Sequence, residues 1–280
     1  MNPADIALLV ELLKRRTGIA LNPAKTHLIE SRLTPVARQF GFRKADALLR
    51  DLLRHGREAM WRAATEALTT NDTWFFRDRA PFEQFRDAVL PVLALRRAAT
   101  RKLRIWCCAV STGQEVYSLA MLLQETPLLA EGWDIELIAT DLNSQSIARA
   151  REGLYTSYEV QRGLGIRRLI TYFNQEGDKW RIAGRLGRMI QFRTFNLLDD
   201  AGWVGTVDAV FCRNVLIYFE EPVKARVLDR LAGTLAEDGY LITGNAEMPD
   251  KVVPFFEALP GRRGLYAVTR PAFMLVSGTY

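Results

Sequence analysis

Cysteine and histidine are scarce in this sequence, with three and two residues among 280. The cysteines, Cys107, Cys108 and Cys212, lie in apolar runs without a Cys-x-x-Cys spacing or a nearby histidine, which favours buried thiols over a metal site or a disulfide. The histidines, His27 and His55, fall in the N-terminal quarter and are expected at the surface or at an interface. We therefore expect no metal site, and chemistry in the rest of the chain proceeds without an imidazole base.

Long apolar runs are missing as well. No stretch approaches the roughly 18–20 residues of a membrane span, and the polar start does not resemble a signal peptide, so we expect a cytoplasmic protein without membrane insertion. Hydrophobic residues make up 49% of the chain and charged residues 25%, which is typical of a folded globular protein. A length of 280 residues suggests one large domain with a smaller appendage.

Positive charge is concentrated at the N-terminal end. The net charge is +6, and residues 1–60 hold eleven Lys and Arg against six Asp and Glu, a surplus of five that leaves one for all later residues. Such a basic region can bind nucleic acid, a membrane surface or an acidic protein. The charges are not gathered in the dense runs that would single out nucleic acid, so the class of partner stays open at this point.

Residues 1–70 are predicted to form an all-α N-terminal domain of four short helices. Asn2-Pro3 and Asn22-Pro23 each place a capping residue before a proline, which is typical of a helix start. Apolar residues recur at helical spacing after both pairs. The N-terminal quarter is therefore expected to be helical throughout.

The second predicted helix has a basic stripe beside its apolar stripe. Lys25, Arg32 and Arg38 form the basic stripe, and Gly41 is the predicted helix end. The simplest interpretation is a solvated outer face. The alternative is a docking surface for an acidic partner.

Residues 71–99 are predicted to be a linker followed by a long helix. Residues 71–79 place clustered aromatic side chains between polar ones, and helical periodicity runs over about 81–99. This segment is expected to join the N-terminal domain to a second domain over residues 100–280.

Residues 100–280 alternate apolar strands with amphipathic helices, which predicts an α/β fold with a doubly wound parallel sheet. Residues 154–187 interrupt the alternation with a helical segment and a short glycine-flanked strand, and we expect a small inserted β-subdomain there. The predicted strands are residues 103–109, 135–140, 189–195, 207–212 and 240–243, and the predicted helices begin at Glu115, Ser144 and Pro222.

Polar residues follow four consecutive predicted strands, at the edge where doubly wound sheets bind ligands. The first turn has a single glycine, Gly113, rather than the three that cradle a pyrophosphate, which disfavours a phosphate-bearing ligand. Asp141 ends the second strand, where a carboxylate can accept both ribose hydroxyls, although it can also cap the next helix. Asn196 and Asn214 follow the next two strands and suit an adenine edge. Together they predict a nucleoside site.

Five motifs resemble those of the CheR family, in the family's order. They are Asn71-Asp72-Thr73-Trp74-Phe75-Phe76-Arg77, Ala109-Val110-Ser111-Thr112-Gly113-Gln114-Glu115-Val116-Tyr117-Ser118, Ala139-Thr140-Asp141, Asn196-Leu197-Leu198 and Phe211-Cys212-Arg213-Asn214-Val215-Leu216-Ile217-Tyr218-Phe219. The second motif departs from the family's usual Gly-Glu-Glu-Pro-Tyr-Ser but retains Glu115. The resemblance covers essentially the whole chain.

This resemblance implies a monomeric chemoreceptor glutamate O-methyltransferase that uses S-adenosylmethionine and releases S-adenosylhomocysteine. It implies a Rossmann-like methyltransferase domain with an inserted β-subdomain, preceded by an all-α domain that docks on the cytoplasmic domains of methyl-accepting chemotaxis receptors. In this picture Lys25, Arg32 and Arg38 contact the acidic receptor helices.

The resemblance also implies the residues of the site. Arg77 and Tyr218 would be catalytic, since a guanidinium can hold a carboxylate and a hydroxyl can orient it. A purely structural role for Tyr218, packed beside Phe219, is the alternative. The implied cofactor-binding residues are Asn71, Thr73, Arg77, Glu115, Asp141, Asn196, Leu197, Asn214 and Val215.

Two other functions stay open. A nucleic-acid methyltransferase would suit the basic end, but base methylation usually relies on an Asp/Asn-Pro-Pro-aromatic loop, and Arg213-Asn214-Val215-Leu216 stands at that place. A non-catalytic module that binds S-adenosylmethionine is disfavoured by the complete set of polar residues.

The inserted subdomain gives one further expectation. In some CheR proteins it captures a peptide at the receptor's C-terminus as an added strand, and those proteins generally have a longer, glycine-containing loop. Residues 174–179 are a short connection here. We therefore expect independence of a receptor tail peptide, with direct receptor contact through Arg181, Arg185 and Arg188.

Overall fold

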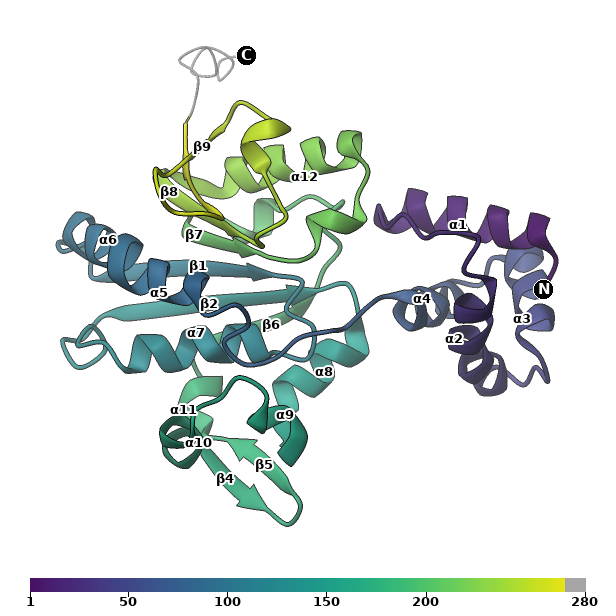
Figure 1. The fold of residues 1–280 in the computed structure, drawn as a ribbon, viewed down its shortest axis with the longest axis horizontal. Coiled ribbons are helices and arrows are strands. Elements are labelled where there is room, and N and C mark those ends of the chain that lie inside the picture. The colour runs from purple at the N-terminus through teal and green to yellow at the C-terminus, as the bar shows by residue number, and fades with distance from the viewer. Residues whose placement is uncertain (270–280) are drawn as a thin grey trace.

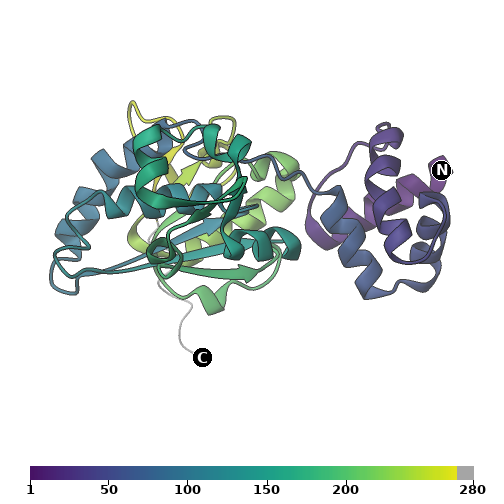
Figure 2. The same ribbon diagram turned by 90° about the horizontal axis from the view of Figure 1, so that it is seen from below.

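The computed structural model describes residues 1–269 and shows an all-helical N-terminal lobe beside a larger α/β domain (Figures 1 and 2). Apolar residues at helical spacing, such as Ile6, Leu9 and Leu13, give the lobe a hydrophobic core of its own. The lobe comprises α1 (Pro3–Thr17), α2 (Thr26–Gln39), α3 (Ala45–His55) and α4 (Glu58–Leu68).

The two predicted Asn-Pro helix starts have different outcomes. Asn2 caps α1 as predicted, through a side-chain hydrogen bond within the first turn. The second prediction is wrong: Asn22 and Pro23 form a turn in which the Asn22 side chain accepts a hydrogen bond from the Ala24 N–H at 2.9 Å, and α2 begins only at Thr26. A turn and a helix start use the same Asn-Pro chemistry, so the pair alone does not decide between them.

The helix predicted after the linker is confirmed, with one irregular turn. It runs through α5 (Ala80–Gln84), the π-helix η1 (Phe85–Val89) and α6 (Leu90–Arg96). Phe82 and Phe85 both pack against Phe211 of the sheet. Their ring centroids lie 6.2 and 5.3 Å, respectively, from that of Phe211. These aromatic contacts fix the helix, and the linker that precedes it, to the α/β domain.

The central sheet has seven strands in the order β6-β2-β1-β7-β8-β10-β9. The first five in this order are parallel, whereas β10 is antiparallel to β8 and to β9. The chain reverses direction across the sheet between β1 and β7, which is where such folds bind ligands. The strands are β1 (Lys102–Cys108), β2 (Asp134–Asp141), β6 (Ile190–Thr194), β7 (Val207–Cys212), β8 (Leu235–Thr243), β9 (Phe256–Ala258) and β10 (Leu265–Val268).

Helices cover both faces of this sheet. Ile105 and Cys107 of β1 face the core shared with α7 (Gln114–Gln124), while Trp106 and Cys108 face the core shared with α12 (Glu221–Thr234). The predicted doubly wound α/β fold is therefore confirmed. The remaining helices of this domain include α8 (Ser144–Glu152) and the 3-10 helices η2 (Gly202–Val204), η3 (Leu216–Tyr218) and η4 (Pro249–Lys251).

The three cysteines are free and buried, as predicted. Burial raises the pKa of the Cys107 and Cys108 thiols. Among residues 1–269, no helix is both long enough and apolar enough to cross a membrane.

The inserted segment forms a three-stranded antiparallel sheet in the order β3-β5-β4, with short helices around it (Figure 1). Its strands β4 and β5 are joined by a two-residue turn in which Gly177 has φ +62. Phe75 of the linker makes edge-to-face contacts with Tyr155 and Phe173 of this subdomain. The elements are β3 (Leu154–Thr156), α9 (Ser157–Gln161), α10 (Ile166–Tyr172), β4 (Phe173–Glu176), β5 (Lys179–Ile182) and α11 (Gly184–Gly187).

The helical lobe is bonded to the α/β domain beside the carboxyl end of β2. The buried Glu66 of α4 accepts hydrogen bonds from the backbone N–H and the hydroxyl of Ser144, at 2.8 and 2.5 Å. Asn143 donates in turn to the Glu66 carbonyl at 3.2 Å. These contacts bring the end of the N-terminal lobe next to the predicted ligand edge of the sheet.

Candidate active site

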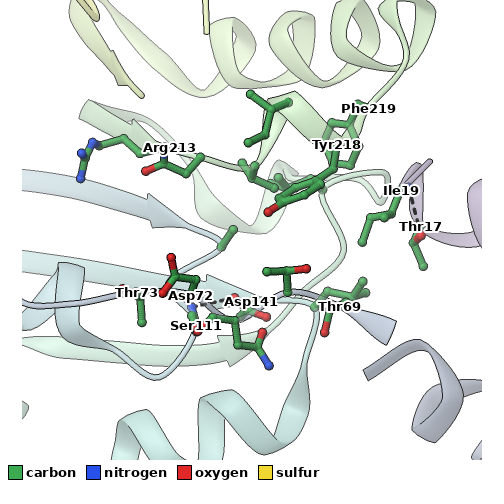
Figure 3. Close-up of a pocket in the computed structure, with 18 of the residues that line it drawn as sticks. Thr17, Ile19, Thr69, Asp72, Thr73, Ser111, Asp141, Arg213, Tyr218 and Phe219 are labelled. Carbon is green, nitrogen blue, oxygen red and sulfur yellow. Dashed lines mark hydrogen bonds between the residues drawn. The ribbon is translucent and has the colours of Figure 1, made fainter. Parts of the chain in front are cut away.

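A cavity lies at the carboxyl ends of β1, β2, β6 and β7, and the helical lobe closes it from one side (Figure 3). One side of the cavity, which we call the sheet wall, lies at the strand ends and is formed by Glu115, Asp141 and Arg213. Its other side, the interdomain wall, is formed by Ile19, Leu21, Tyr218 and Phe219. Every residue predicted to bind the cofactor or to act in catalysis lines this cavity: Asn71, Thr73, Arg77, Glu115, Asp141, Asn196, Leu197, Asn214, Val215 and Tyr218.

Asp141 ends β2 with a buried carboxylate. Its two oxygens accept hydrogen bonds from the backbone N–H groups of Ser111, at 2.7 Å, and Asn143, at 2.8 Å. Burial raises the pKa of Asp141, while these two hydrogen bonds lower it. Capping of α8 falls to Asn143, whose side chain accepts from the N–H of Ser146, so Asp141 is not the helix cap. Each of its oxygens keeps a lone pair for a ligand hydroxyl.

Glu115 is paired with Arg213, a contact that the sequence did not indicate. The Glu115 carboxylate accepts from the Arg213 guanidinium at 2.6 Å, and that guanidinium also donates to the Arg77 carbonyl and to the Asp78 carboxylate. Burial raises the pKa of Glu115, and the positive charge of Arg213 opposes the rise. The pair puts one acceptor, the Glu115 carboxylate, into the cavity wall for a cationic ligand group.

Arg77 is held by the linker at the edge of the cavity. Its guanidinium donates to the Asp72 carbonyl at 2.7 Å and lies over the Trp74 ring at 4.4 Å. In the described part of the chain, the buried Nε–H groups of Arg77 and Arg213 have no hydrogen-bond acceptor. Phe76, Asp78 and Arg79 have positive φ, which is uncommon for residues other than glycine and concentrates at functional sites.

Tyr218 stands where the two domains meet. Its ring extends into the cavity (Figure 3), and its carbonyl accepts a hydrogen bond from the Ala20 N–H at 2.9 Å. Ile19 and Phe219 form an isolated antiparallel bridge next to it. The segment between α1 and α2 therefore contacts the catalytic candidate directly, although nothing in its sequence had suggested a site role.

Asn196 has a second task besides lining the cavity. Its side-chain nitrogen donates to the Arg16 carbonyl of α1 at 2.8 Å, and its side-chain oxygen accepts from the Leu198 N–H at 3.1 Å. The amide thus joins the loop after β6 to the helical lobe. Its role as an adenine contact stays a prediction.

The three predicted docking residues differ in their surroundings. Lys25 precedes α2 and Arg38 lies in its last turn, and both are exposed. Arg32 is half-buried, and its guanidinium donates to the carbonyls of Leu68 and Thr69 at 2.9 and 3.2 Å. Arg32 therefore caps the end of α4, which its place in a basic stripe did not reveal.

The residues present fit S-adenosylmethionine. The Asp141 carboxylate suits the ribose hydroxyls, the Glu115 carboxylate suits an ammonium, and the Arg77 and Arg213 guanidinium groups suit a carboxylate. The turn after β1 has only Gly113 to approach a ligand closely, in keeping with a ligand without phosphate. Within residues 1–269, no group of three or more His, Cys, Asp or Glu residues is placed to hold a metal ion.

Comparison with known proteins identifies two family domains in this chain. "CheR methyltransferase, all-alpha domain" matches residues 4–69, and "CheR methyltransferase, SAM binding domain" matches residues 71–265. The chain is 38% identical to chemotaxis protein methyltransferase 1 of Pseudomonas aeruginosa over 87% of this chain and 90% of that protein. It is 35% identical to the chemotaxis protein methyltransferase of Vibrio parahaemolyticus over 90% and 92%.

Likeness to solved structures is weaker. A plantazolicin methyltransferase in complex with SAH aligns over 79% of this chain and 60% of its own at 10% identity, with a TM-score of 0.34, too low to support an inference. The two family matches cover nearly the whole of both domains and include every cavity residue except Thr70. The chain therefore belongs to the CheR methyltransferase family, the chemotaxis protein methyltransferases that use S-adenosylmethionine.

Proposed function

We propose that this protein transfers the methyl group of S-adenosylmethionine to glutamate side chains in the cytoplasmic domains of chemoreceptors, forming methyl esters. The observation that carries the proposal is the chemistry of the cavity wall. Among the described residues, it offers a guanidinium, Arg77, and a phenol, Tyr218, but neither a histidine nor a lysine, and its buried carboxylates Glu115 and Asp141 already accept hydrogen bonds. This set is suited to a nucleophile that is already ionised.

A glutamate carboxylate meets that condition, since its ordinary pKa is about 4.3 and it carries its charge at neutral pH. S-adenosylmethionine supplies a methyl group on a positively charged sulfur. One carboxylate oxygen forms a bond to that methyl carbon as the carbon–sulfur bond breaks, and the electron pair stays on sulfur. Both products are neutral at the reacting centre, so no proton has to be moved.

The protein's own residues would orient the reactants. Arg77 is held in place by Trp74 and the Asp72 carbonyl, and it has N–H groups left to hold a carboxylate. The Tyr218 hydroxyl can orient the same group from the interdomain wall. Ile19, Leu21 and Phe219 line that side with apolar groups, which would reduce the solvation of two opposite charges that cancel on transfer.

Receptor docking is proposed on the exposed part of the helical lobe and on the inserted subdomain. Lys25 and Arg38 are exposed and suit an acidic helical partner. In the structure, the Arg181 side chain donates a hydrogen bond to the Glu176 carboxylate and the Arg185 side chain donates one to the Thr171 carbonyl. The two-residue turn of the β4–β5 hairpin leaves no long loop to wrap a peptide, which supports independence of a receptor tail.

The decisive experiment is methyl transfer from labelled S-adenosylmethionine to purified receptor cytoplasmic fragments, followed by mild alkali. Esters release volatile methanol under these conditions, whereas methyl groups on nitrogen do not. We expect alkali-labile label on the wild-type receptor fragment and none on a fragment whose methylated glutamates are replaced by glutamine. Alkali-stable label, or no label on the wild-type receptor fragment, would contradict the proposal.

Tail-peptide independence needs its own measurement. Titration of the full chain with synthetic C-terminal receptor pentapeptides should give no heat up to millimolar peptide. Binding at about micromolar concentration, worth about −8 kcal/mol, would show that the short hairpin does capture a tail.

A further inference from the structure

Glu247 holds an unusual position behind the cavity. It follows β8, is 5% exposed, and its carboxylate accepts hydrogen bonds from four backbone N–H groups. Gly244 and Asn214 donate to one oxygen at 2.7 and 2.8 Å, and Val215 and Leu216 donate to the other at 2.9 and 2.7 Å. Three of these donors are consecutive residues of the loop after β7.

That loop builds much of the cavity. Asn214, Val215, Ile217 and Tyr218 all line it. Asn214 has φ +59, a left-handed conformation that is uncommon outside glycine and that asparagine adopts more readily than most residues. Successive N–H groups that point the same way form an anion-binding concavity, and here the anion is supplied by the protein itself.

Glu247 is in turn anchored to the sheet. Its carbonyl accepts from the Thr243 hydroxyl of β8 at 3.1 Å and from the Tyr266 hydroxyl of β10 at 3.4 Å. Gly244 lets the two segments approach, because a Cβ there would lie 2.8 Å from the Asn214 side-chain nitrogen and from the Glu247 carboxylate. The antiparallel strand β10 thus supports the loop through Glu247.

We infer that Glu247 is a positioning residue for the cofactor site. It does not line the cavity; it fixes the backbone of residues 214–216 so that Asn214 and Val215 face the ligand. The inference rests on the proposed use of those two residues as cofactor contacts. It extends that proposal by naming the group that sets their geometry.

Glu247→Gln tests the inference with little change in size. A glutamine has one oxygen and one NH₂ group, so two of the four backbone N–H groups lose their acceptor and face a donor instead. Asp208→Asn is the matched control. Asp208 is also a buried carboxylate, bonded to the Arg97 side chain and the Arg104 N–H at 2.7 and 2.8 Å, but it lies at the opposite end of β7.

Calorimetry with S-adenosylhomocysteine and hydrogen exchange of the full chain are the two readouts. Glu247→Gln should raise the Kd by about tenfold or more, and the amides of residues 214–216 should exchange faster. Asp208→Asn should lower the thermal midpoint without either change. Should Glu247→Gln fail to fold, Glu247→Asp keeps the charge but shortens the side chain by one methylene, and the Kd should again rise.

A wild-type Kd in the folded glutamine variant would overturn the inference. Equal losses of affinity in Glu247→Gln and Asp208→Asn would overturn it too, because they would reflect general destabilisation. Failure of the proposed function looks different: wild-type protein would bind S-adenosylhomocysteine and respond to Glu247→Gln, yet leave no alkali-labile methyl group on receptors.

Discussion

The two walls of the cavity are held by different kinds of contact. In the sheet wall, the Asp141 carboxylate is fixed by two backbone N–H groups and Glu115 by the buried Arg213 guanidinium. In the interdomain wall, the Tyr218 carbonyl accepts a backbone hydrogen bond from Ala20 across the domain boundary, next to the Ile19–Phe219 bridge. The salt bridge beside that wall, Lys14 to Glu220, is partly exposed and is therefore expected to contribute little.

Because the two walls are held differently, we expect cofactor affinity and the rate of methyl transfer to respond to different mutations. The cofactor contacts proposed for Asp141 and Glu115 belong to the sheet wall, so they should persist whatever the helical lobe does. The position of Tyr218 depends on how the lobe sits against the loop after β7. Changes to the sheet wall should therefore act first on stability and cofactor affinity, and changes to the interdomain wall on the rate of transfer.

The largest effect is expected at Arg213. Arg213→Met removes the partner of Glu115 and leaves a buried carboxylate without its positive charge, which should lower the free energy of unfolding by about 3–5 kcal/mol. Urea denaturation measures this. Arg38→Met, at an exposed position, should stay within about 0.5 kcal/mol of wild type. A small loss at Arg213 would show that the sheet wall is less rigid than its contacts indicate.

Asp141→Ala comes next and acts on cofactor affinity. Loss of a buried charged acceptor should weaken S-adenosylhomocysteine binding by about 1–3 kcal/mol, measured by calorimetry. Asp199→Ala, an exposed residue outside the cavity, is the control and should bind normally. Unchanged affinity in Asp141→Ala would refute the assignment of this carboxylate to the ribose.

Gly18→Ala probes the interdomain wall. Its Cβ would lie 2.9 Å from a Val223 side-chain carbon and 3.2 Å from the Phe219 ring, so these side chains or the lobe must shift, at a cost of about 1–3 kcal/mol. We expect slower methyl transfer at saturating cofactor with an unchanged Kd for S-adenosylhomocysteine. Gly41→Ala has the same left-handed φ with no atom within 4 Å, and should leave the rate unaltered. Equal rates in both variants would remove the proposed distinction between the walls.

The smallest effect is expected on the exposed basic face. The double variant Lys25→Glu, Arg38→Glu should raise the KM for receptor fragments. Each exposed charge pair that is lost should weaken docking by roughly 0.2–1 kcal/mol, and added salt should have the same effect. Arg32→Glu should instead lower the thermal midpoint, because its guanidinium holds the Leu68 and Thr69 carbonyls. Methylation that is indifferent to both salt and the double reversal would mean that this face is only solvated.

The sequence located the parallel strands β1, β2 and β7 well, because each is a mostly buried apolar run whose pattern is local. It also located β6, which is mostly exposed, but for β8 it predicted only residues 240–243 of Leu235–Thr243. Residues 207–212 were predicted with the bounds that β7 has. The strands β3, β4, β9 and β10 were not predicted. They have only three or four residues each and depend on antiparallel partners, so their own sequence holds little signal.

Composition and local pattern determined the helical lobe, the doubly wound sheet and the polar residues at its carboxyl edge, since these follow from periodicity and from where strands end. Tertiary structure alone decided which partners fix those residues. Arg213 lies 98 positions from Glu115, and Glu247 lies 33 from Asn214. Ala20 reaches Tyr218 only because two domains pack together. No local pattern encodes such contacts, because they depend on how complete elements pack rather than on the residues beside them.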